Sequence, residues 1–197
     1  MSSESPDRGL EGEMPSTTSG IGETLQRVRR ERGLSLRTLA SRAGFSPSFF
    51  SQVENGQTSP SIASLEKLAG SLGLRLVDFF EEVQSLADTP GEASPRRHLT
   101  SEWSRASMEP LLAKGSLQRL DGMVITIATG GRSGKKPSTS TTEQLVYVLE
   151  GRLALSLDDD RQLVLEAGGA AAIPAGCSYL WHNSGPRKSR VLVVTAR

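Results

Sequence analysis

The sequence predicts a multidomain α + β protein, in which a five-helix N-terminal domain precedes an all-β domain. The first observation is a change in hydrophobic spacing, from a period of about 3.6 residues before Phe80 to a period of about two after Val124. The second is the intervening segment with Pro90, Gly91 and Pro95, which is typical of a linker. We therefore expect a disordered tail, a helical domain, a linker and a β domain, at residues 1–18, 19–83, 84–105 and 106–197.

Capping signals divide the first domain into short helices. Ser35, Ser46 and Ser61 each precede an apolar-periodic stretch, as N-cap residues do, and proline follows Ser46 at the first helical position. Gly44 is a typical residue for the end of a helix. The five expected helices begin near Ile21, Ser35, Ser46, Ser61 and Leu76, and end before Gly33, at Gly44, at Asn55, near Leu72 and near Val83.

Runs of aliphatic and β-branched residues indicate strands in the second domain. Turn signals such as Glu150-Gly151-Arg152 and Asp158-Asp159-Asp160 separate them. The expected strands cover residues 124–127, 145–149, 153–157, 163–165, 171–173 and 191–195. Many short strands joined by such turns favour a sandwich or a barrel.

The charge of the chain is unevenly distributed. The net charge is +1, but residues 27–42 carry six arginines against Glu31 alone, while residues 1–18 carry one arginine against four acids. A basic stretch within a near-neutral chain suits attraction to phosphate, although a solvated helix face has the same composition.

Other features bear on the compartment. No apolar run approaches the ~20 residues that cross a bilayer, and the polar N-terminus lacks the apolar core of a secretory signal. A single cysteine, Cys177, excludes an internal disulfide and fits a reducing environment. We expect a cytoplasmic protein with no membrane partner.

Residues 34–56, LSLRTLASRAGFSPSFFSQVENG, form two helices joined at Gly44. With their flanks, over residues 21–80, they resemble the Cro/repressor-type helix-turn-helix of the xenobiotic-response-element family, also called lambda-repressor-like. The residues that carry the resemblance are Leu34-Ser35-Leu36, Leu39-Ala40, Gly44, Ser46-Pro47-Ser48, Ser51-Gln52, Glu54-Asn55-Gly56, Pro60, Leu65 and Leu68-Ala69. The resemblance implies double-stranded operator DNA as the ligand, whereas the spacing alone implies only a packed helical bundle.

The same resemblance assigns DNA contacts. It places Ser46, Pro47, Ser48 and Gln52 where family members touch bases and neighbouring phosphates. Gln52 is the expected principal base reader, because an amide can bond N6 and N7 of adenine together. The candidate phosphate contacts, basic or short polar residues near helix ends, are Arg37, Arg42, Asn55 and Thr58. Each arginine alone is equally compatible with a solvated surface charge.

Arg29 and Glu54 are assigned a different role. In the family, the equivalent pair is a salt bridge that links the first helix to the third. The resemblance therefore implies a structural role for Arg29 and removes it from the DNA contacts.

Residues 131–151 and 168–183 resemble the two sequence motifs of the cupin family. The scaffold positions match at Gly151, Gly168, Pro174, Gly176 and Asn183, although the spacer after Gly131 is one residue longer than the family pattern. The resemblance covers about residues 106–197 and implies an all-β jelly-roll barrel.

The metal-ligand positions of these motifs hold other residues. The histidines of the first motif fall on Ser138 and Ser140, its glutamate falls on Gln144, and the histidine of the second falls on Tyr179. Hydroxyl, amide and phenol groups do not replace the imidazole and carboxylate ligands of a transition metal. The histidines of the chain are His98, in the expected linker, and His182, which strand alternation turns outward. We expect no metal, no cofactor and no metal-dependent enzyme.

Polar and aromatic side chains remain to line the barrel, namely Ser138, Ser140, Gln144, Tyr179 and Trp181. They are suited to orient a small-molecule effector in an apolar cavity, and they are equally suited to satisfy one another in a barrel filled by its own side chains. Cys177, on the face of Tyr179, is expected to be a buried inert thiol and not a redox sensor, because no cation is near it in sequence.

The two resemblances together imply a known type of transcription regulator, a homodimer on a pseudo-palindromic operator whose cupin senses a metabolite. One alternative is a ligand-independent DNA-binding protein whose cupin only dimerises. A filled barrel would support it, and an empty cavity near Gln144 and Tyr179 would count against it. The other alternative is a cupin enzyme tethered to a DNA-binding domain, which needs the missing ligands. Operator binding places the protein at the nucleoid.

Overall fold

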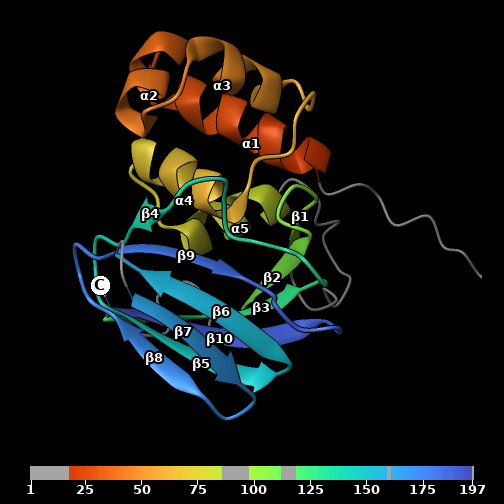
Figure 1. Ribbon diagram of the computed structural model, residues 1–197. Helices are drawn as coiled ribbons and strands as arrows, with labels where there is room; N and C mark the ends of the chain where they lie inside the picture. Colours follow the sequence, from red (N-terminus) through yellow and green to blue (C-terminus); the bar gives the residue numbers. More distant parts are fainter. Residues whose placement is uncertain (1–17, 86–97, 112–118, 159–160, 197) are drawn as a thin grey trace, which may run out of the picture.

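The computed structural model describes residues 18–85, 98–111, 119–158 and 161–196 (Figure 1). It contains a helical domain and a β domain, stacked one on the other. The expected disordered tail lies outside the described residues except for Thr18, and so do residues 86–97 of the expected linker.

Five helices form the first domain, as the capping signals predict: α1 Thr18–Glu31, α2 Leu36–Ala43, α3 Pro47–Glu54, α4 Ile62–Ser71 and α5 Leu76–Ser85. The hydroxyls of Ser35, Ser46 and Ser61 accept the backbone N–H groups three residues later, at 3.1 to 3.2 Å. Each serine thereby satisfies one of the donors that a helix start leaves without a partner. Gly44 ends α2 in the left-handed region at φ 71°.

Ten strands form two antiparallel sheets in the second domain. The strands are β1 Leu99–Ser101, β2 Ala106–Pro110, β3 Leu120–Ile127, β4 Ser138–Thr139, β5 Gln144–Glu150, β6 Arg152–Leu157, β7 Arg161–Glu166, β8 Ala170–Ile173, β9 Ser178–His182 and β10 Ser189–Ala196. One sheet has the order β1-β2-β3-β10-β5-β8, and the other has the order β4-β9-β6-β7. Their apolar inner faces enclose the core of this domain.

Four of these strands, β1, β2, β4 and β9, were not among the six strands expected from the sequence, although alternation along a strand was assumed around His182. β1 lies inside the segment expected to be a linker, where Leu99 is fully buried and pairs with Met108 of β2. Buried Ser101 and Ser104 follow, so residues 98–105 of the expected linker are part of the β domain. Their small polar side chains give no hydrophobic period, and long-range contacts fix the strand instead.

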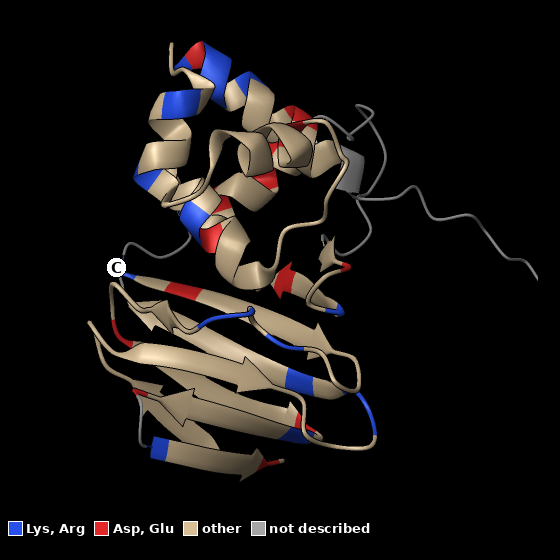
Figure 2. Ribbon diagram, turned by 45° about the horizontal axis from the view of Figure 1, so that its top comes forward, with Lys and Arg blue, Asp and Glu red and all other residues tan. Residues whose placement is uncertain are grey.

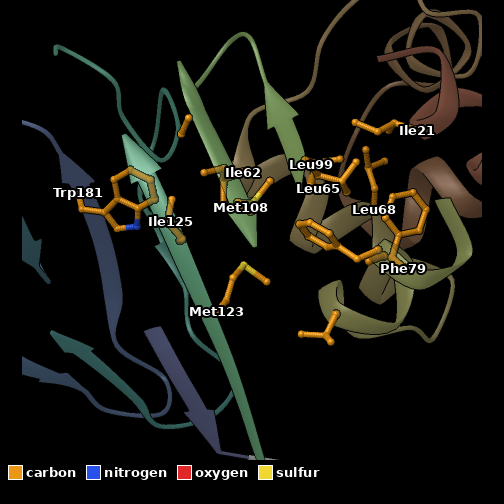
Figure 3. Packing of buried hydrophobic residues seen from close by; sticks show 14 of the residues in the cluster. Ile21, Ile62, Leu65, Leu68, Phe79, Leu99, Met108, Met123, Ile125 and Trp181 are labelled. Atoms are coloured by element: carbon orange, nitrogen blue, oxygen red, sulfur yellow. The ribbon is translucent and has the colours of Figure 1, made fainter. Parts of the chain in front are cut away.

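The two domains share one hydrophobic core. Figure 3 shows Ile62 of α4 close to Met108 and Ile125 of the β domain, with Leu65 close to Leu99. α4 lies next to the β domain, whereas α2 and α3 lie on the other side of α4 (Figure 1). The helix that follows the helix-turn-helix is therefore the one that docks on the barrel.

Hydrogen bonds fix the start of α4 against the β domain. The backbone N–H of Ile62 donates to Ser104 Oγ at 3.0 Å, and that of Ala63 donates to the carbonyl of Ser133 at 3.1 Å. Ser101 Oγ donates to the carbonyl of Pro60 at 2.7 Å. The β domain thus supplies acceptors for two N–H groups of the first turn of the helix.

A second attachment lies beyond the other end of α4. Arg75 forms ion pairs with Asp78 of α5 and Asp121 of β3. α4 is therefore attached to the β domain near both of its ends. Ser101 and Ser104 hold its start, and Arg75 holds the turn after its end. None of the helices in the described part of the chain is long and apolar enough to cross a membrane.

Candidate nucleic-acid interface and ligand pocket

One face of α3 is exposed and polar. Ser46, Pro47, Ser48 and Gln52 are all exposed, while Phe50 and Val53 on the opposite face are buried. The Ser46 cap and Pro47 in the first turn fix the start of the helix. The sequence-predicted base contacts therefore lie together at an accessible helix N-terminus.

Two contacts hold α3 in place. The Arg29 guanidinium of α1 binds the Glu54 carboxylate in a bidentate pair, with Nε to Oε1 at 2.7 Å and Nη2 to Oε2 at 2.9 Å. The rings of Phe45 and Phe49 lie 4.8 Å apart and pack against the core. The expected structural pair is confirmed, and the carboxylate raises the pKa of Arg29 through its hydrogen bonds.

The candidate phosphate contacts are spread over a wider surface. Arg37 and Arg42 are both exposed, but five residues of helix place them about 140° apart around the axis of α2. Figure 2 shows basic residues on several helices of this domain. Asn55 is exposed, with its amide donating to Ser51 Oγ at 3.4 Å, and Thr58 is half-buried. These four residues do not form one cluster.

Arg42 has a basic neighbour that sequence analysis did not identify. It lines a surface hollow together with Lys67, an exposed residue of α4. Only the packing of α4 against α2 brings the two cations to the same hollow, and no sequence motif indicates it.

The interior of the barrel is almost filled. Gln144, Tyr179 and Trp181 line a cavity of about 20 Å³ together with aliphatic side chains of both sheets and Ile62 of α4. A volume of this size holds about one water molecule. The interior therefore has no room for an effector in this conformation.

A larger cleft lies at the mouth of the barrel, between the two domains. Its volume is about 560 Å³. Ser138, Ser140, Gln144 and Tyr179 line it on the barrel side. The helical domain contributes residues of α4, of the following turn and of α5, namely Ile62, Glu66, Lys67, Gly70, Leu74, Arg75, Leu76 and Val77. Four of the five predicted pocket residues thus border this cleft, and Trp181 lies deeper.

Glu66 is a polar residue of the cleft that the sequence analysis missed. The hydroxyl of Tyr179 donates to Glu66 Oε2 at 3.0 Å. Burial raises the pKa of the Glu66 carboxyl, and burial next to this carboxyl raises the pKa of the Tyr179 phenol. The carboxyl of the helical domain therefore reaches the position at which the second cupin motif would supply a metal ligand.

Metal-ligating groups do not gather at this position. Among residues 18–85, 98–111, 119–158 and 161–196, no three His, Cys, Asp or Glu side chains come together. His98 and His182 are exposed. Two serine hydroxyls, an amide and a phenol whose raised pKa keeps it protonated do not fit a divalent transition metal.

Cys177 is a buried thiol with 7% of its surface exposed. Burial, the largest cause, raises the pKa of the thiol, and the nearby carboxylate of Asp158 raises it further. The reactive thiolate is therefore disfavoured, as expected for an inert side chain.

Comparison with known proteins identifies both domains. A family profile described as "Helix-turn-helix domain" matches residues 21–78, and one described as "Cupin domain" matches residues 123–195. An HTH_3 family transcriptional regulator from Vibrio cholerae has a similar structure, with a TM-score of 0.71 at 22% identity over 92% of this chain and 97% of that one. This likeness shows that the two-domain fold is shared.

Two transcriptional regulators are similar in sequence. The HTH-type regulator SutR of Escherichia coli K12 is 28% identical over 84% of this chain and 88% of SutR. The HTH-type regulator SinR of Bacillus subtilis 168 is 37% identical over 43% of this chain and 71% of SinR. The chain therefore belongs to the helix-turn-helix family of transcriptional regulators and carries a C-terminal cupin domain.

Proposed function

We propose that the protein acts in the cytoplasm, at the nucleoid, as a homodimeric regulator that reads a pseudo-palindromic operator and responds to a small-molecule effector. In this proposal the cupin domain has no metal and no catalytic role. Ser46, Pro47, Ser48 and Gln52 contact bases and adjacent phosphates, and Arg37, Arg42, Asn55 and Thr58 contact the DNA backbone.

The exposed start of α3 is the observation that carries this proposal. Ser46, Pro47 and Ser48 are exposed at its start, and Gln52 lies one turn beyond Ser48 on the same face, while Phe50 and Val53 are packed in the core. An α-helix with free polar side chains near its N-terminus fits the major groove. The bidentate contact of Arg29 with Glu54 holds this helix in a fixed orientation.

The outer face of the six-stranded sheet supports a homodimer. Leu145 and Tyr147 of β5 are exposed there, and both strands beside β5 add apolar side chains. The cross-strand neighbours on this face are Leu192 and Val194 of β10 and Ala170 and Ala172 of β8. A continuous apolar face is typical of an interaction surface, and we assign it to a second copy of the chain.

The cleft favours an effector over a purely structural cupin. The small interior cavity supports the alternative in which the barrel only dimerises. The cleft of about 560 Å³, however, combines apolar walls with Ser138, Ser140, Gln144 and Tyr179, as small-molecule sites do. We therefore place the effector at the mouth of the barrel and not inside it.

Selection of bound duplexes from a random DNA library tests the DNA-binding function. The full chain should enrich an inverted repeat whose half-sites lie about 10 base pairs apart, or a multiple of this spacing, since each protomer presents one α3. Gln52→Ala should change the enriched sequence. Gln162→Ala, at an exposed glutamine of β7, serves as the matched control and should not change it. Enrichment of no sequence would contradict specific operator binding, and a single half-site would contradict the homodimer.

A further inference from the structure

We propose that the effector site is shared by both domains and that it binds a small molecule with a protonated amine. The amine lies against the Glu66 carboxylate, and the apolar part of the ligand lies along the cleft. This inference rests on the proposed function for its effect on DNA binding, but binding of the amine can be measured without DNA.

The position of Glu66 relative to the cleft is the first argument. Glu66 lines both the interior cavity and the larger cleft, and among the residues that the structure describes its carboxyl accepts one hydrogen bond, from Tyr179. A carboxylate has about four acceptor positions, so one phenol leaves most of its capacity unused. A ligand in the cleft can therefore reach this carboxyl directly.

The charges around the cleft are the second argument. Arg75 and Asp121 also line it, but they pair with each other, and Arg75 pairs with Asp78 as well. Lys67 follows Glu66 in the chain and is exposed, and its charge only partly offsets the effect of burial on the Glu66 pKa. A half-buried carboxylate without a full counter-charge is unfavourable, and an ammonium group that forms an ion pair with it relieves this cost.

The rest of the cleft defines the other part of the ligand. Apolar side chains from both domains line it, including Leu74 and Leu76 on one side and Met123 and Val193 on the other. The volume of about 560 Å³ is within the usual range for a small-molecule site. An aliphatic amine satisfies both parts of this surface, whereas a carboxylic acid would place a like charge beside Glu66.

The location of the site links it to the DNA-binding domain. Glu66 and Ile62 belong to α4, which packs against α2 of the helix-turn-helix. A ligand between α4 and the barrel changes the contacts that hold the domains together. The orientation of α3 in one protomer relative to the other then depends on whether the cleft is occupied.

Thermal unfolding of the full chain with hexylammonium chloride as the probe tests the site. At about ten times its dissociation constant, the probe should raise the melting temperature by about 3 °C. Sodium chloride, 1-hexanol and sodium hexanoate at the same concentration should not. Glu66→Gln should abolish the shift, and Glu66→Asp should reduce it while retaining the preference for the amine. Glu143→Gln, an exposed glutamate beside Gln144, is the matched control and should leave the shift unchanged.

Two results would overturn the inference: equal stabilisation by 1-hexanol, or a shift that persists in Glu66→Gln. An unchanged melting temperature at hexylammonium concentrations up to about 50 mM, well above the dissociation constant of a specific site, would also overturn it. Operator binding measured in parallel separates this inference from the proposed function. Specific DNA binding without an amine shift rejects only the amine site. An amine shift in a chain that binds no operator rejects the regulatory function and keeps the site.

Discussion

Arg29 and Glu54 join α1 to the end of α3 through a bidentate ion pair that is almost removed from solvent. The Glu54 side chain is 3% exposed and the Arg29 side chain is 12% exposed. Arg29 also donates to the carbonyl of Leu34 at 3.0 Å, just before α2. One guanidinium therefore fixes the ends of three helices relative to one another, and α3 presents its polar face because its C-terminal end is held.

Removal of one partner of this pair should cost about 3 kcal/mol of unfolding free energy or more, because the other charge stays buried without a partner. Arg29→Met and Glu54→Leu should each lower the unfolding free energy. The double variant should lose less unfolding free energy than the two single losses added together. Urea unfolding of the four proteins in a double-mutant cycle measures this coupling.

The pair of Arg27 with Glu31 is the control for this cycle. It is an i, i+4 contact in which the side chains are 30% and 57% exposed. Its coupling should not exceed about 0.5 kcal/mol, because solvent screens it. Equal coupling in the two cycles would contradict the structural role of Arg29 and Glu54.

Tyr147 tests the proposed dimer surface. A charge at the centre of the apolar patch on β10, β5 and β8 should weaken self-association by about 30-fold or more, as expected for a central interface residue worth about 2 kcal/mol. Light scattering after size-exclusion chromatography should show dimeric wild type and monomeric Tyr147→Glu at low micromolar concentration. Val164→Glu, at an exposed position of the other sheet, should stay dimeric. A dimeric Tyr147→Glu would place the interface elsewhere.

Local signals were sufficient to predict the helical domain. Ser35, Ser46, Ser61 and Gly44 each act on residues within one turn, so their effects are visible in a short stretch of sequence. The outward direction of His182 and the burial of Tyr179 and Trp181 likewise follow from strand alternation alone. The two-domain order and most strands were predicted for the same reason.

The contacts between the domains could not be predicted in this way. Glu66 carries no motif, and it meets Tyr179 across 113 positions of sequence only because α4 docks on the mouth of the barrel. The short strand at Leu99–Ser101 is defined by its pairing with Met108 and by the contact of Ser101 with Pro60 just before α4, not by its own composition. Sequence analysis therefore identified the barrel side of the cleft and missed the helical side.

The donor groups of the barrel predict a protein without a bound transition metal. Ser138, Ser140, Gln144 and Tyr179 supply no imidazole and no carboxylate at the motif positions. Elemental analysis after expression in metal-supplemented medium should find well below one equivalent of iron, manganese or zinc per chain. A full equivalent that resists mild chelation would contradict this interpretation of the barrel.

Glu66 should make stability depend on pH in a defined direction. Its pKa is raised from its ordinary value of 4.5 in the folded state. At pH values between 4.5 and the raised pKa of the folded state, the folded chain binds the proton more strongly than the unfolded chain. The unfolding free energy therefore falls as pH rises through this range. Burial is the largest cause of this shift, while the hydrogen bond from Tyr179 and the charge of Lys67 act in the opposite direction.

Glu66→Gln removes this titration. The unfolding free energy of the variant minus the unfolding free energy of the wild type should therefore increase as pH rises from about 5 to about 8. Urea unfolding at a series of pH values measures this difference. Glu143→Gln, which changes the same charge at an exposed position, should give a flat difference. A flat difference for Glu66→Gln would show that the carboxyl is not desolvated in solution.

Gln52 and the arginines of α2 should affect DNA binding in different ways. Gln52 lies on the exposed face of α3, one turn from its start, where an amide reaches base edges. The substitution Gln52→Ala should weaken the free energy of binding to the operator by roughly 1–3 kcal/mol and change binding to scrambled DNA little. Arg37 and Arg42 lie on α2, which in the proposed binding mode crosses the DNA backbone. Loss of either should weaken both duplexes alike and lower the salt slope of log K by about one per monomer.

Salt titrations of Gln52→Ala, Arg37→Ala and Arg42→Ala on operator and scrambled duplexes measure these differences. Arg161→Ala, at an exposed arginine of β7, is the matched control and should leave both the affinity and the slope unchanged. Because Arg37 and Arg42 point about 140° apart around α2, a change in slope for only one of them would identify the side of α2 that faces the phosphates. The assigned roles would be reversed if Gln52→Ala lost the same affinity for both duplexes while an arginine variant lost affinity for the operator alone. No effect from any of the three variants would show that α3 is not the recognition helix.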